Sequence, residues 1–405
     1  MTDLVVVGAG TMGAWTALRA VRAGRSVTLL DAYGPGNSRA SSGDETRIIR
    51  SSHGEDTFYA RWSRASREAW IVLGLAIGQP IFIEAGALWF ARREEGFESA
   101  SFATLAGLGI PVQRLTPAEI AARWPGTAVE DLAFAVFEPE GGLLLARRGV
   151  AATAERAVIE GAALDLAAAR PGHIDGDRLV DVEDASGRRW AGDQFVFACG
   201  PWLPKVLPDV VGAAIRVTKQ DLHYLGPAAG DGRWDAPRFP SWVDYDAAFY
   251  GIGSIEGRGT KVATDSYGEP WDPDSGARVV GPESIEAVRE YCRRRFPALA
   301  DAPVLESRVC QYETTSDSHF LIDRHPSLSN VWLAGGGSGH GFKHGPAIGQ
   351  YVVSLLDGHE PAGEELRFSL RRDAGAPAGL RTIADAPADS ADSAHPADSA
   401  GSGRG

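Results

Sequence analysis

Residues 4–13 read LVVVGAGTMG, and residues 26–31 read SVTLLD. The first run is an apolar strand that ends in a glycine turn, and a helical pattern follows it as far as Val21. The second run is again short and apolar. Strand, tight turn, helix and strand in this order, within about 30 residues, predict a parallel βαβ unit.

The glycine turn predicts a nucleotide site. Gly8, Gly10 and Gly13 have the spacing G-x-G-x-x-G. The first permits the turn, the second lets backbone approach a pyrophosphate, and the third lets the helix pack closely on the strand. Asp31 ends the second strand, where its carboxylate can accept hydrogen bonds from ribose hydroxyls and repels a 2′-phosphate. The motif cannot separate FAD from NAD, and its alternative is a glycine-rich turn in an unrelated α/β fold.

Composition limits the classes of protein and of partner. The 405 residues are 44% hydrophobic, enough for a large core shared by two cooperating domains. The formal net charge is −13, and the 40 basic residues are scattered, which argues against nucleic acid or an anionic membrane as partner. No run reaches the roughly 18 apolar residues of a membrane helix.

The three cysteines, Cys199, Cys292 and Cys310, are widely spaced. They predict neither a disulfide framework nor a zinc site, and we expect no metal. No secretion signal precedes the first strand. We therefore expect a cytoplasmic protein.

The rest of the chain alternates between the two element types. The predicted strands are 81–91, 194–199, 216–225, 249–263, 304–312 and 320–323, and the predicted helices lie near 56–76, 117–124, 147–161, 283–296 and 345–357. Residues 330–334 predict a further buried strand, which three glycines and a helix follow. We expect this C-terminal strand to belong to the first domain's sheet. The fold class is therefore α/β (α+β mixed), with interleaved parts. Residues 372–405 are rich in Ala, Asp and Ser, and predict a disordered tail.

Several ordered motifs carry a family resemblance. They are SSGDETRIIR at 41–50, FEPEGGLL at 137–144, ACGPW at 198–202, FYGIGSIEGRGTK at 249–261, CQY at 310–312, HFLID at 319–323 and SGHGFK at 338–343. Together they resemble the monomeric sarcosine oxidase and N-methyltryptophan oxidase family of flavin amine oxidases, within the D-amino-acid-oxidase superfamily. The resemblance spans roughly residues 3 to 358.

This resemblance implies FAD and a two-domain architecture. A Rossmann-like FAD-binding domain would comprise 1–80, 145–215 and 315–365, and a substrate domain with an antiparallel sheet would comprise 81–144 and 216–314. The residues expected to bind FAD are Gly8, Gly10, Gly13, Asp31, Ser42, Thr46, Arg47, Cys310, Gly337, Gly339, Gly341 and Lys343.

Cys310 matches the family's cysteine that bonds through sulfur to the 8α-methyl carbon of the flavin. This chemistry needs a thiolate, which a neighbouring arginine favours, and Arg308 is close in sequence. The alternative is an inert core cysteine. Arg47 resembles an arginine beneath the flavin, with a structural ion pair as its alternative. Cys199 and Cys292 are expected to be core and structural residues.

Two further matches concern charge. Arg50 and Lys343 resemble the family's pair that holds the substrate carboxylate, a task suited to a planar fork and a point charge. The alternative is two surface cations. Lys261 resembles the lysine that activates O2, where a buried cation stabilises developing negative charge. Its alternative is a lysine in solvent at a strand edge.

Tyr250 and Tyr312 match two tyrosines of the substrate cavity, although each is equally compatible with a core aromatic. Asp265 departs from the pattern, because the sarcosine-specific enzymes carry histidine there. A carboxylate in the cavity favours a substrate with an additional donor or cationic group.

The resemblance predicts a monomeric, FAD-dependent oxidase of a secondary amine, namely an N-methyl or cyclic amino acid, which yields an imine and H2O2. The substrate would be a small amino-acid-like amine together with O2. Alternatives are a primary-amine or D-amino-acid-type oxidase, a flavin dehydrogenase with a non-oxygen acceptor, and a non-catalytic FAD-binding sensor.

Overall fold

The predicted βαβ unit is present in the computed structural model, which describes residues 2–370. It consists of β1 (Thr2–Val7), α1 (Thr11–Arg22) and β2 (Val27–Asp31), and the two strands pair in parallel. Apolar side chains fill both faces of β1, as expected for a parallel strand covered on both sides. The predicted tail at 372–405 lies outside the described residues.

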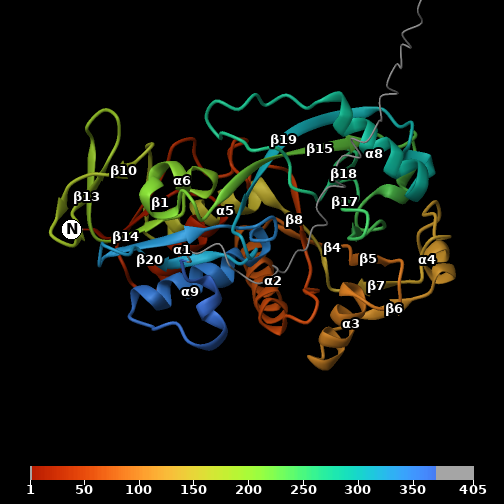
Figure 1. Ribbon diagram of the computed structural model, residues 1–405, viewed down its shortest axis with the longest axis horizontal. Coiled ribbons are helices and arrows are strands. Elements are labelled where there is room, and N and C mark those ends of the chain that lie inside the picture. The colour runs from red at the N-terminus through yellow and green to blue at the C-terminus, as the bar shows by residue number, and fades with distance from the viewer. Residues whose placement is uncertain (1, 371–405) are drawn as a thin grey trace, which may run out of the picture.

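The strand β1 lies in the middle of the first sheet. Its parallel core has the order β9, β2, β1, β14, β21, and β20 adds an antiparallel edge. The labels β1, β14 and β20 mark this sheet in Figure 1. The β10–β13 pair extends the start of β14. These strands are β9 (Ala163–Leu166), β10 (Arg170–Pro171), β13 (Asp181–Glu183), β14 (Arg189–Phe197), β20 (Leu321–Arg324) and β21 (Val331–Gly335). The predicted return of the C-terminal region to the first sheet is confirmed by β21.

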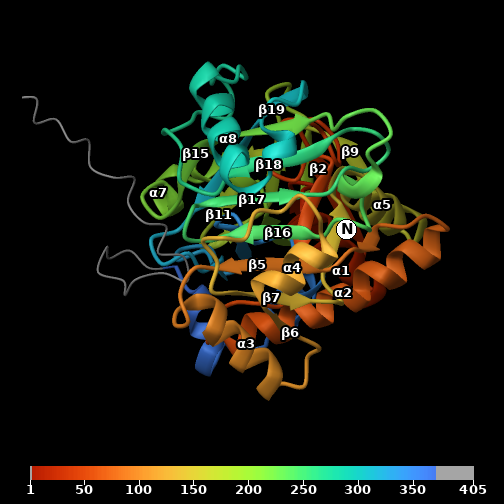
Figure 2. The same cartoon turned by 90° about the vertical axis from the view of Figure 1, so that its right-hand side faces the viewer.

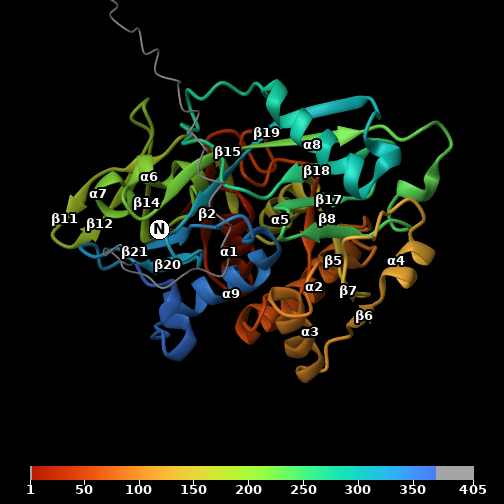
Figure 3. The same cartoon turned by 45° about the vertical axis from the view of Figure 1, so that its right-hand side comes forward.

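Helices cover the first sheet on the side of α1. The helix α9 (Gly345–Leu356) packs directly along α1 (Figure 3), and α2 (Thr57–Ile77) and α5 (Ala146–Ile159) complete this layer. The N-terminus of α2 is capped by Asp56, whose carboxylate accepts the Tyr59 N–H at 3.0 Å. One apolar core joins these helices to the sheet.

The second sheet lies beside the first and runs in the order β19, β15, β18, β17, β16, β5, β7, β6 (Figure 2). Its pairs are antiparallel except for β16 with β5. The strands are β5 (Ala87–Ala91), β6 (Gln113–Leu115), β7 (Phe134–Glu138), β15 (Arg216–Leu225), β16 (Ser241–Asp244), β17 (Phe249–Ile252), β18 (Thr260–Thr264) and β19 (Val304–Thr314). The helices of this part are α3 (Phe97–Gly107), α4 (Pro117–Arg123) and α8 (Pro282–Arg295).

Two predicted strands are wrong in extent. The run 81–91 divides into β4 (Phe82–Glu84) and β5, which belong to different sheets, because Gly86 between them turns the chain with a φ of +79°. The run 249–263 divides into the hairpin β17–β18 at a glycine-rich turn. The sequence also gave no signal for α3 or for the small sheet of β3 (Thr46–Ile49), β8 (Gly142–Leu145) and β4.

The interleaving of the two parts is confirmed. Strands of the first sheet come from three separated stretches, and strands of the second come from the segments between them. The domain boundaries given above stay a prediction. Of the helices in residues 2–370, none combines the length and apolar character that a bilayer-spanning helix needs.

The contact between α1 and α9 yields a test of this packing. A Cβ at Gly349 would lie 2.6 Å from the backbone carbon of Trp15, so Gly349→Ala forces the helices apart. We expect a loss of about 1–3 kcal/mol in the free energy of unfolding, measured by denaturant titration. Gly107→Ala is the matched control, because no atom lies within 4 Å of its added Cβ. Equal stability of the two variants would contradict this packing.

Candidate functional site

The turn between β1 and α1 has room only for glycine at two positions. Gly8 has a φ of +103°, and an added Cβ would lie 2.3 Å from the Ala198 carbonyl oxygen. A Cβ at Gly13 would lie 1.8 Å from the Gly8 carbonyl oxygen, so close helix packing requires this residue. At Gly10 the nearest atom to an added Cβ is the Ser42 hydroxyl at 3.7 Å. The protein itself therefore leaves space beside Gly10.

Asp31 lies at the end of β2 and is partly engaged by backbone. Its carboxylate accepts N–H groups from Ala9 and Tyr33, each at 2.8 Å. Burial raises the pKa of this carboxyl, and the backbone donors oppose the shift. These contacts hold the carboxylate at the mouth of the glycine turn.

Residues from both large sheets line one cavity of about 480 Å³, within the range of roughly 300–1,000 Å³ typical of small-molecule sites. Most of the predicted site residues line it. They are Gly8, Gly10, Asp31, Ser42, Arg47, Arg50, Tyr250, Asp265, Cys310, Tyr312, Gly337, Gly339, Gly341 and Lys343. The fold thus brings together residues that are up to 335 positions apart, from Gly8 to Lys343 (343 − 8 = 335).

Three predicted residues lie outside this lining, namely Gly13, Thr46 and Lys261. Lys261 is on β18 and is 1% exposed, so it is not a solvent lysine. Its ammonium group contacts the Thr46 carbonyl at 3.2 Å and lies 5.5 Å from the centre of the Tyr250 ring. Lys261 is therefore in direct contact with a residue of the lining.

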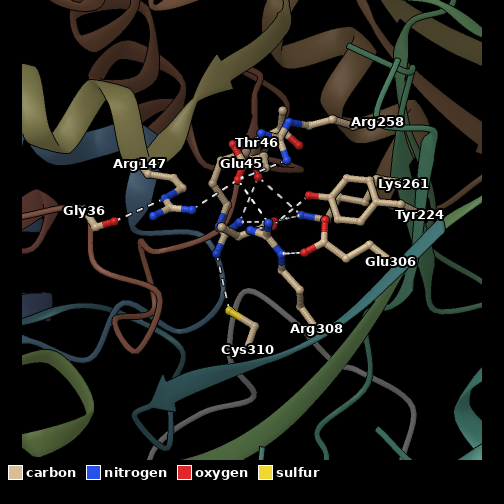
Figure 4. Close-up of polar contacts among 12 residues, drawn as sticks. Gly36, Glu45, Thr46, Arg147, Tyr224, Arg258, Lys261, Glu306, Arg308 and Cys310 are labelled. Carbon is tan, nitrogen blue, oxygen red and sulfur yellow. Dashed lines mark hydrogen bonds and ion pairs between the residues drawn. The ribbon is translucent and has the colours of Figure 1, made fainter. Parts of the chain in front are cut away.

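The buried carboxylate of Asp44 joins the elements around Lys261. Figure 4 shows the side chains of Lys261, Tyr224 and Arg308 directed toward the same group of polar contacts. It forms an ion pair with the Lys261 ammonium, and accepts hydrogen bonds from Arg47 and from the Tyr224 hydroxyl, both at 2.7 Å. Arg308 is 3.6 Å away. Burial would raise the pKa of this carboxyl, but Lys261 and Arg47 together hold it well below its usual range. Asp44 is therefore a charged centre shared by three cations.

Cys310 lies on β19 beside a cation. An N–H of Arg47 donates to its sulfur at 3.3 Å, and the sulfur lies 3.7 Å from the Ser41 carbonyl. Arg308, the nearest arginine in sequence, pairs instead with Glu45 at 3.1 Å. The arginine at the sulfur therefore comes from the motif of residues 41–50 and not from the strand that carries the cysteine.

The other two cysteines have environments that favour the neutral thiol. Burial raises the pKa of Cys292 to about 12 and raises that of Cys199 further. Cys292 lies inside the core under the second sheet, whereas Cys199 lines the cavity next to the Val7 carbonyl. The thiolate form needed for nucleophilic chemistry is disfavoured at both.

Arg50 and Lys343 are both buried and both line the cavity, so neither is a surface cation. The guanidinium of Arg50 donates to the Ser52 carbonyl and lies 4.8 Å from the centre of the Trp89 ring. The Lys343 ammonium donates to the His340 carbonyl at 2.9 Å. Both positive charges act on the same histidine, His53, which shows that the fold brings them together.

His53, His340 and His344 gather next to these cations. Their nearest nitrogens all lie within 4.8 Å of one another, which makes them the one cluster among residues 2–370 that has the spacing of a metal site. Burial, together with Arg50 and Lys343, lowers the pKa of His53 and of His344 well below its ordinary value. The same two positive charges oppose a metal cation, so the cluster acts as neutral packing around the cationic pair.

Asp265 is buried in the wall of the cavity and accepts a hydrogen bond from the Tyr312 hydroxyl at 3.3 Å. Burial raises the pKa of Tyr250 well above its ordinary value, so its hydroxyl stays neutral. A small side cavity of about 20 Å³ adjoins this region. Its lining is mainly aromatic, with Arg50 and Asp265 at its edge, and comprises Arg50, His53, Trp89, Phe97, Val243, Tyr245, Asp265 and His340.

Comparison with known families agrees with this geometry. The model of the DAO family, described as FAD dependent oxidoreductase, matches residues 3–355. This chain belongs to that family. It is an FAD-dependent oxidoreductase that acts on CH–NH donors.

Curated relatives of the same family match over nearly their whole length. The monomeric sarcosine oxidase of Bacillus sp. (strain NS-129) is 30% identical, with 92% of this chain and 97% of the relative covered. The N-methyl-L-tryptophan oxidase of Salmonella heidelberg (strain SL476) is 25% identical, with 91% and 98% covered. A modified fructosyl peptide oxidase from Aspergillus nidulans has the same fold, with a TM-score of 0.82 at 23% identity and 96% of each chain covered.

The residues of this family member fit FAD. The glycine turn leaves space beside Gly10 at the start of α1, where a helix N-terminus presents N–H groups to phosphate. The carboxylate of Asp31 can accept hydrogen bonds from ribose hydroxyls, and the cavity continues from these residues to Arg47 and Cys310. Such a path matches an elongated dinucleotide.

Asp44 and Glu313 are two acidic residues of this region that were not among the predicted site residues. Asp44 lies within the quoted motif, but its partner Lys261 is 217 residues away, and no local pattern joins them. Glu313 lines the cavity three residues after Cys310. In a regular strand, residues three positions apart point to opposite faces, so the alternation of the strand predicted that Glu313 would point away from the side of Cys310.

The Asp44 centre yields a stability prediction. Asp44→Asn removes the carboxylate shared by Lys261 and Arg47, and leaves the buried ammonium of Lys261 and the partly buried guanidinium of Arg47 without this charge. We expect the free energy of unfolding to fall by about 3–5 kcal/mol in denaturant titration. Asp246→Asn is the control, because its partner Arg93 is exposed, and it should change stability by less than about 1 kcal/mol. Similar losses for both variants would contradict the central place of Asp44.

Proposed function

We propose that this chain is an oxidase of secondary amino acids that yields an imine and H2O2. The observation that carries the proposal is the pair of buried cations, Arg50 and Lys343, in the wall of a cavity whose other walls fit FAD. A guanidinium and an ammonium in one cavity wall together suit the binding of a carboxylate, and an amino-acid substrate supplies that group. The relatives named for sarcosine and N-methyl-L-tryptophan support a secondary amine as the donor.

The substrate carboxylate would be held by the planar fork of Arg50 and the point charge of Lys343. The aromatic residues that line the side cavity next to Arg50 would face the substrate side chain or ring. Asp265 at the edge of this cavity favours a substrate with an additional donor or cationic group. The secondary amines to test first are N-methyl amino acids and cyclic imino acids such as pipecolate and proline.

Bound FAD supplies the chemistry by accepting a hydride equivalent from the carbon next to the amine. The residues of this chain orient the substrate and set the charge around it. Neutral Tyr250 and Tyr312 hydroxyls offer hydrogen bonds without removing protons. An amine that binds unprotonated needs no strong base, and it loses its N–H proton as the imine forms.

We assign Lys261 to the reaction with O2. Its buried ammonium would stabilise negative charge that oxygen gains as it accepts electrons. Burial lowers the pKa of Lys261, while Asp44 opposes this by pairing with the ammonium. Asp44 would thereby act as a positioning residue for this cation.

We further propose that FAD is bonded covalently to Cys310. The guanidinium of Arg47 at its sulfur supports this assignment, because a cation there stabilises the thiolate. Cys199 and Cys292, with their raised pKa values, serve in packing. The three cysteines of the described chain are free, which supports the cytoplasm as the location, and we expect a monomer with the domain boundaries given above.

A substrate panel tests the function. We expect at least one N-methyl or cyclic amino acid to bleach the flavin absorbance without air, and admission of air to restore it with release of H2O2. Bleaching by primary D-amino acids alone would favour the primary-amine alternative. Bleaching that persists in air would favour a dehydrogenase, and a flavin that no amine bleaches would favour a sensor.

Lys261→Met separates the two half-reactions. We expect reoxidation of the reduced enzyme by O2 to slow at least about 100-fold, since one preorganised charge contributes this much, while anaerobic reduction changes little. Stopped-flow absorbance measures both rates. Equal slowing of reduction and reoxidation would contradict the assignment.

Cys310→Ala tests the covalent bond. Acid precipitation of the unmutated protein should leave the yellow colour in the pellet, and precipitation of Cys310→Ala should release it. Cys199→Ala is the matched control and should keep the colour. A colourless pellet from the unmutated protein would rule the bond out.

A further inference from the structure

Glu313 is a buried carboxyl group in the cavity wall that no role described so far uses. It lies near the end of β19, is 8% exposed and lines the same cavity as Cys310. Two glycines approach its oxygens closely. A Cβ at Gly200 would lie 3.0 Å from Oε2, and one at Gly337 would lie 3.2 Å from Oε1.

One oxygen of this carboxyl is unsatisfied. Among residues 2–370, Oε2 has no hydrogen-bond partner, and the Gly337 N–H is the group that favours the charged form. A buried polar atom without a partner is costly, and such atoms commonly mark a site that a ligand completes. Burial raises the pKa of Glu313 to about 7, so the protonated acid is populated near neutral pH.

The charged and titratable groups around Glu313 do not neutralise it. Cys199 faces it before η1 (Gly200–Trp202), with a thiol whose pKa is raised by burial, and Glu313 contributes to that shift. In the glycine-rich loop of residues 335–341, the His340 ring forms a hydrogen bond with the Ser318 carbonyl. On β15, the residue that pairs with Glu313 is Val217, and the adjacent Arg216 is exposed to solvent. No cation in the described chain compensates a Glu313 carboxylate.

The position of Glu313 relates it to the phosphate end of the cofactor site. A Cβ added at its neighbour Gly337 would lie 3.7 Å from the terminal methyl group of Met12, whose backbone belongs to the first turn of α1, and Gly10, Thr11 and Met12 line the same cavity as Glu313. That turn is the one expected to hold the pyrophosphate. A carboxylate beside a pyrophosphate would be repelled, whereas a carboxylic acid can donate to one of its oxygens or to a ribityl hydroxyl.

We propose that Glu313 binds FAD as a neutral carboxylic acid, so that binding of FAD is linked to uptake of one proton at this residue. The proposal rests on FAD in the cavity described above, and it is independent of which amine is oxidised. The O–H of Glu313 donates to the chain that joins the flavin ring to the ADP part. Its carbonyl oxygen keeps the contact with the Gly337 N–H.

The sign of the linkage follows from the two states. Bound FAD buries the acid further and brings negative phosphate close, so both effects raise the pKa of Glu313 above its value of about 7 in the free protein. The affinity for FAD is then at its maximum below about pH 7. Above it the affinity falls by about tenfold per pH unit until the pKa of the complex is reached.

The test uses apoprotein of the full chain with Cys310→Ala, in which FAD binding is reversible. Quenching of FAD fluorescence gives Kd from about pH 6 to about pH 9. We expect Kd to rise about tenfold per pH unit above about pH 7, and Glu313→Gln, which is neutral at every pH, to make Kd independent of pH. A slope that persists in Glu313→Gln would overturn the proposal.

Glu98→Gln is the matched control. Burial also raises the pKa of Glu98 to about 7, but this residue lies in α3 outside the lining of the cavity. It should leave the pH dependence unchanged, and loss of the slope in this variant would assign the proton elsewhere. Because the readout is binding, failure of amine oxidation does not affect it.

A second measurement covers the case in which Cys310→Ala apoprotein does not bind FAD. In the holoenzyme, the infrared carbonyl band of a protonated carboxylic acid should persist above about pH 8 and disappear in Glu313→Gln. Absence of this band from the unmutated holoenzyme would overturn the proposal as well.

Discussion

The Asp44 carboxylate is the contact on which the arrangement of the site depends. It lies in the loop before β3 and binds Lys261 from β18, Tyr224 from β15 and Arg47 from its own motif. One buried anion thereby ties the segment after the dinucleotide unit to the second sheet. Because an unpaired charge at this depth would be costly, the three partners are held in place together.

This tie has a direct consequence for the cofactor cavity. With Arg47 anchored on Asp44, its second amino group reaches the Cys310 sulfur on β19. The cavity is therefore closed on one side by the first sheet with its glycine turn, and on the other by strands that the Asp44 centre positions. Neither sheet forms the site alone.

Three buried carboxyl groups and the partly exposed Asp31 have different partners in this site. Asp44 has cations around it and is charged, whereas Asp31 has backbone N–H groups that oppose the effect of burial. Glu313 has neither a cation nor a second donor, and its pKa rises to about 7. Asp265 lies across the cavity wall with a tyrosine hydroxyl as its partner. The same functional group is an ion-pair centre at Asp44, and in the proposals above it would accept hydrogen bonds from ribose at Asp31, carry a proton at Glu313 and select the substrate at Asp265.

Local sequence alone determined the βαβ unit, because its strand, turn, helix and strand follow one another directly, and the atom that requires glycine at position 13 is the Gly8 carbonyl oxygen of the same turn. It also determined the fold class, and most of the site residues that the resemblance implied do line the cavity. It did not divide the runs 81–91 and 249–263, since an apolar run does not show at which glycine a chain changes sheets. Only the tertiary structure decided that Arg47 and not Arg308 meets Cys310, that Lys261 pairs with Asp44, and that Glu313 enters the cavity. These contacts join strands that are distant in sequence, and their geometry depends on sheet pairing, which residue spacing does not encode.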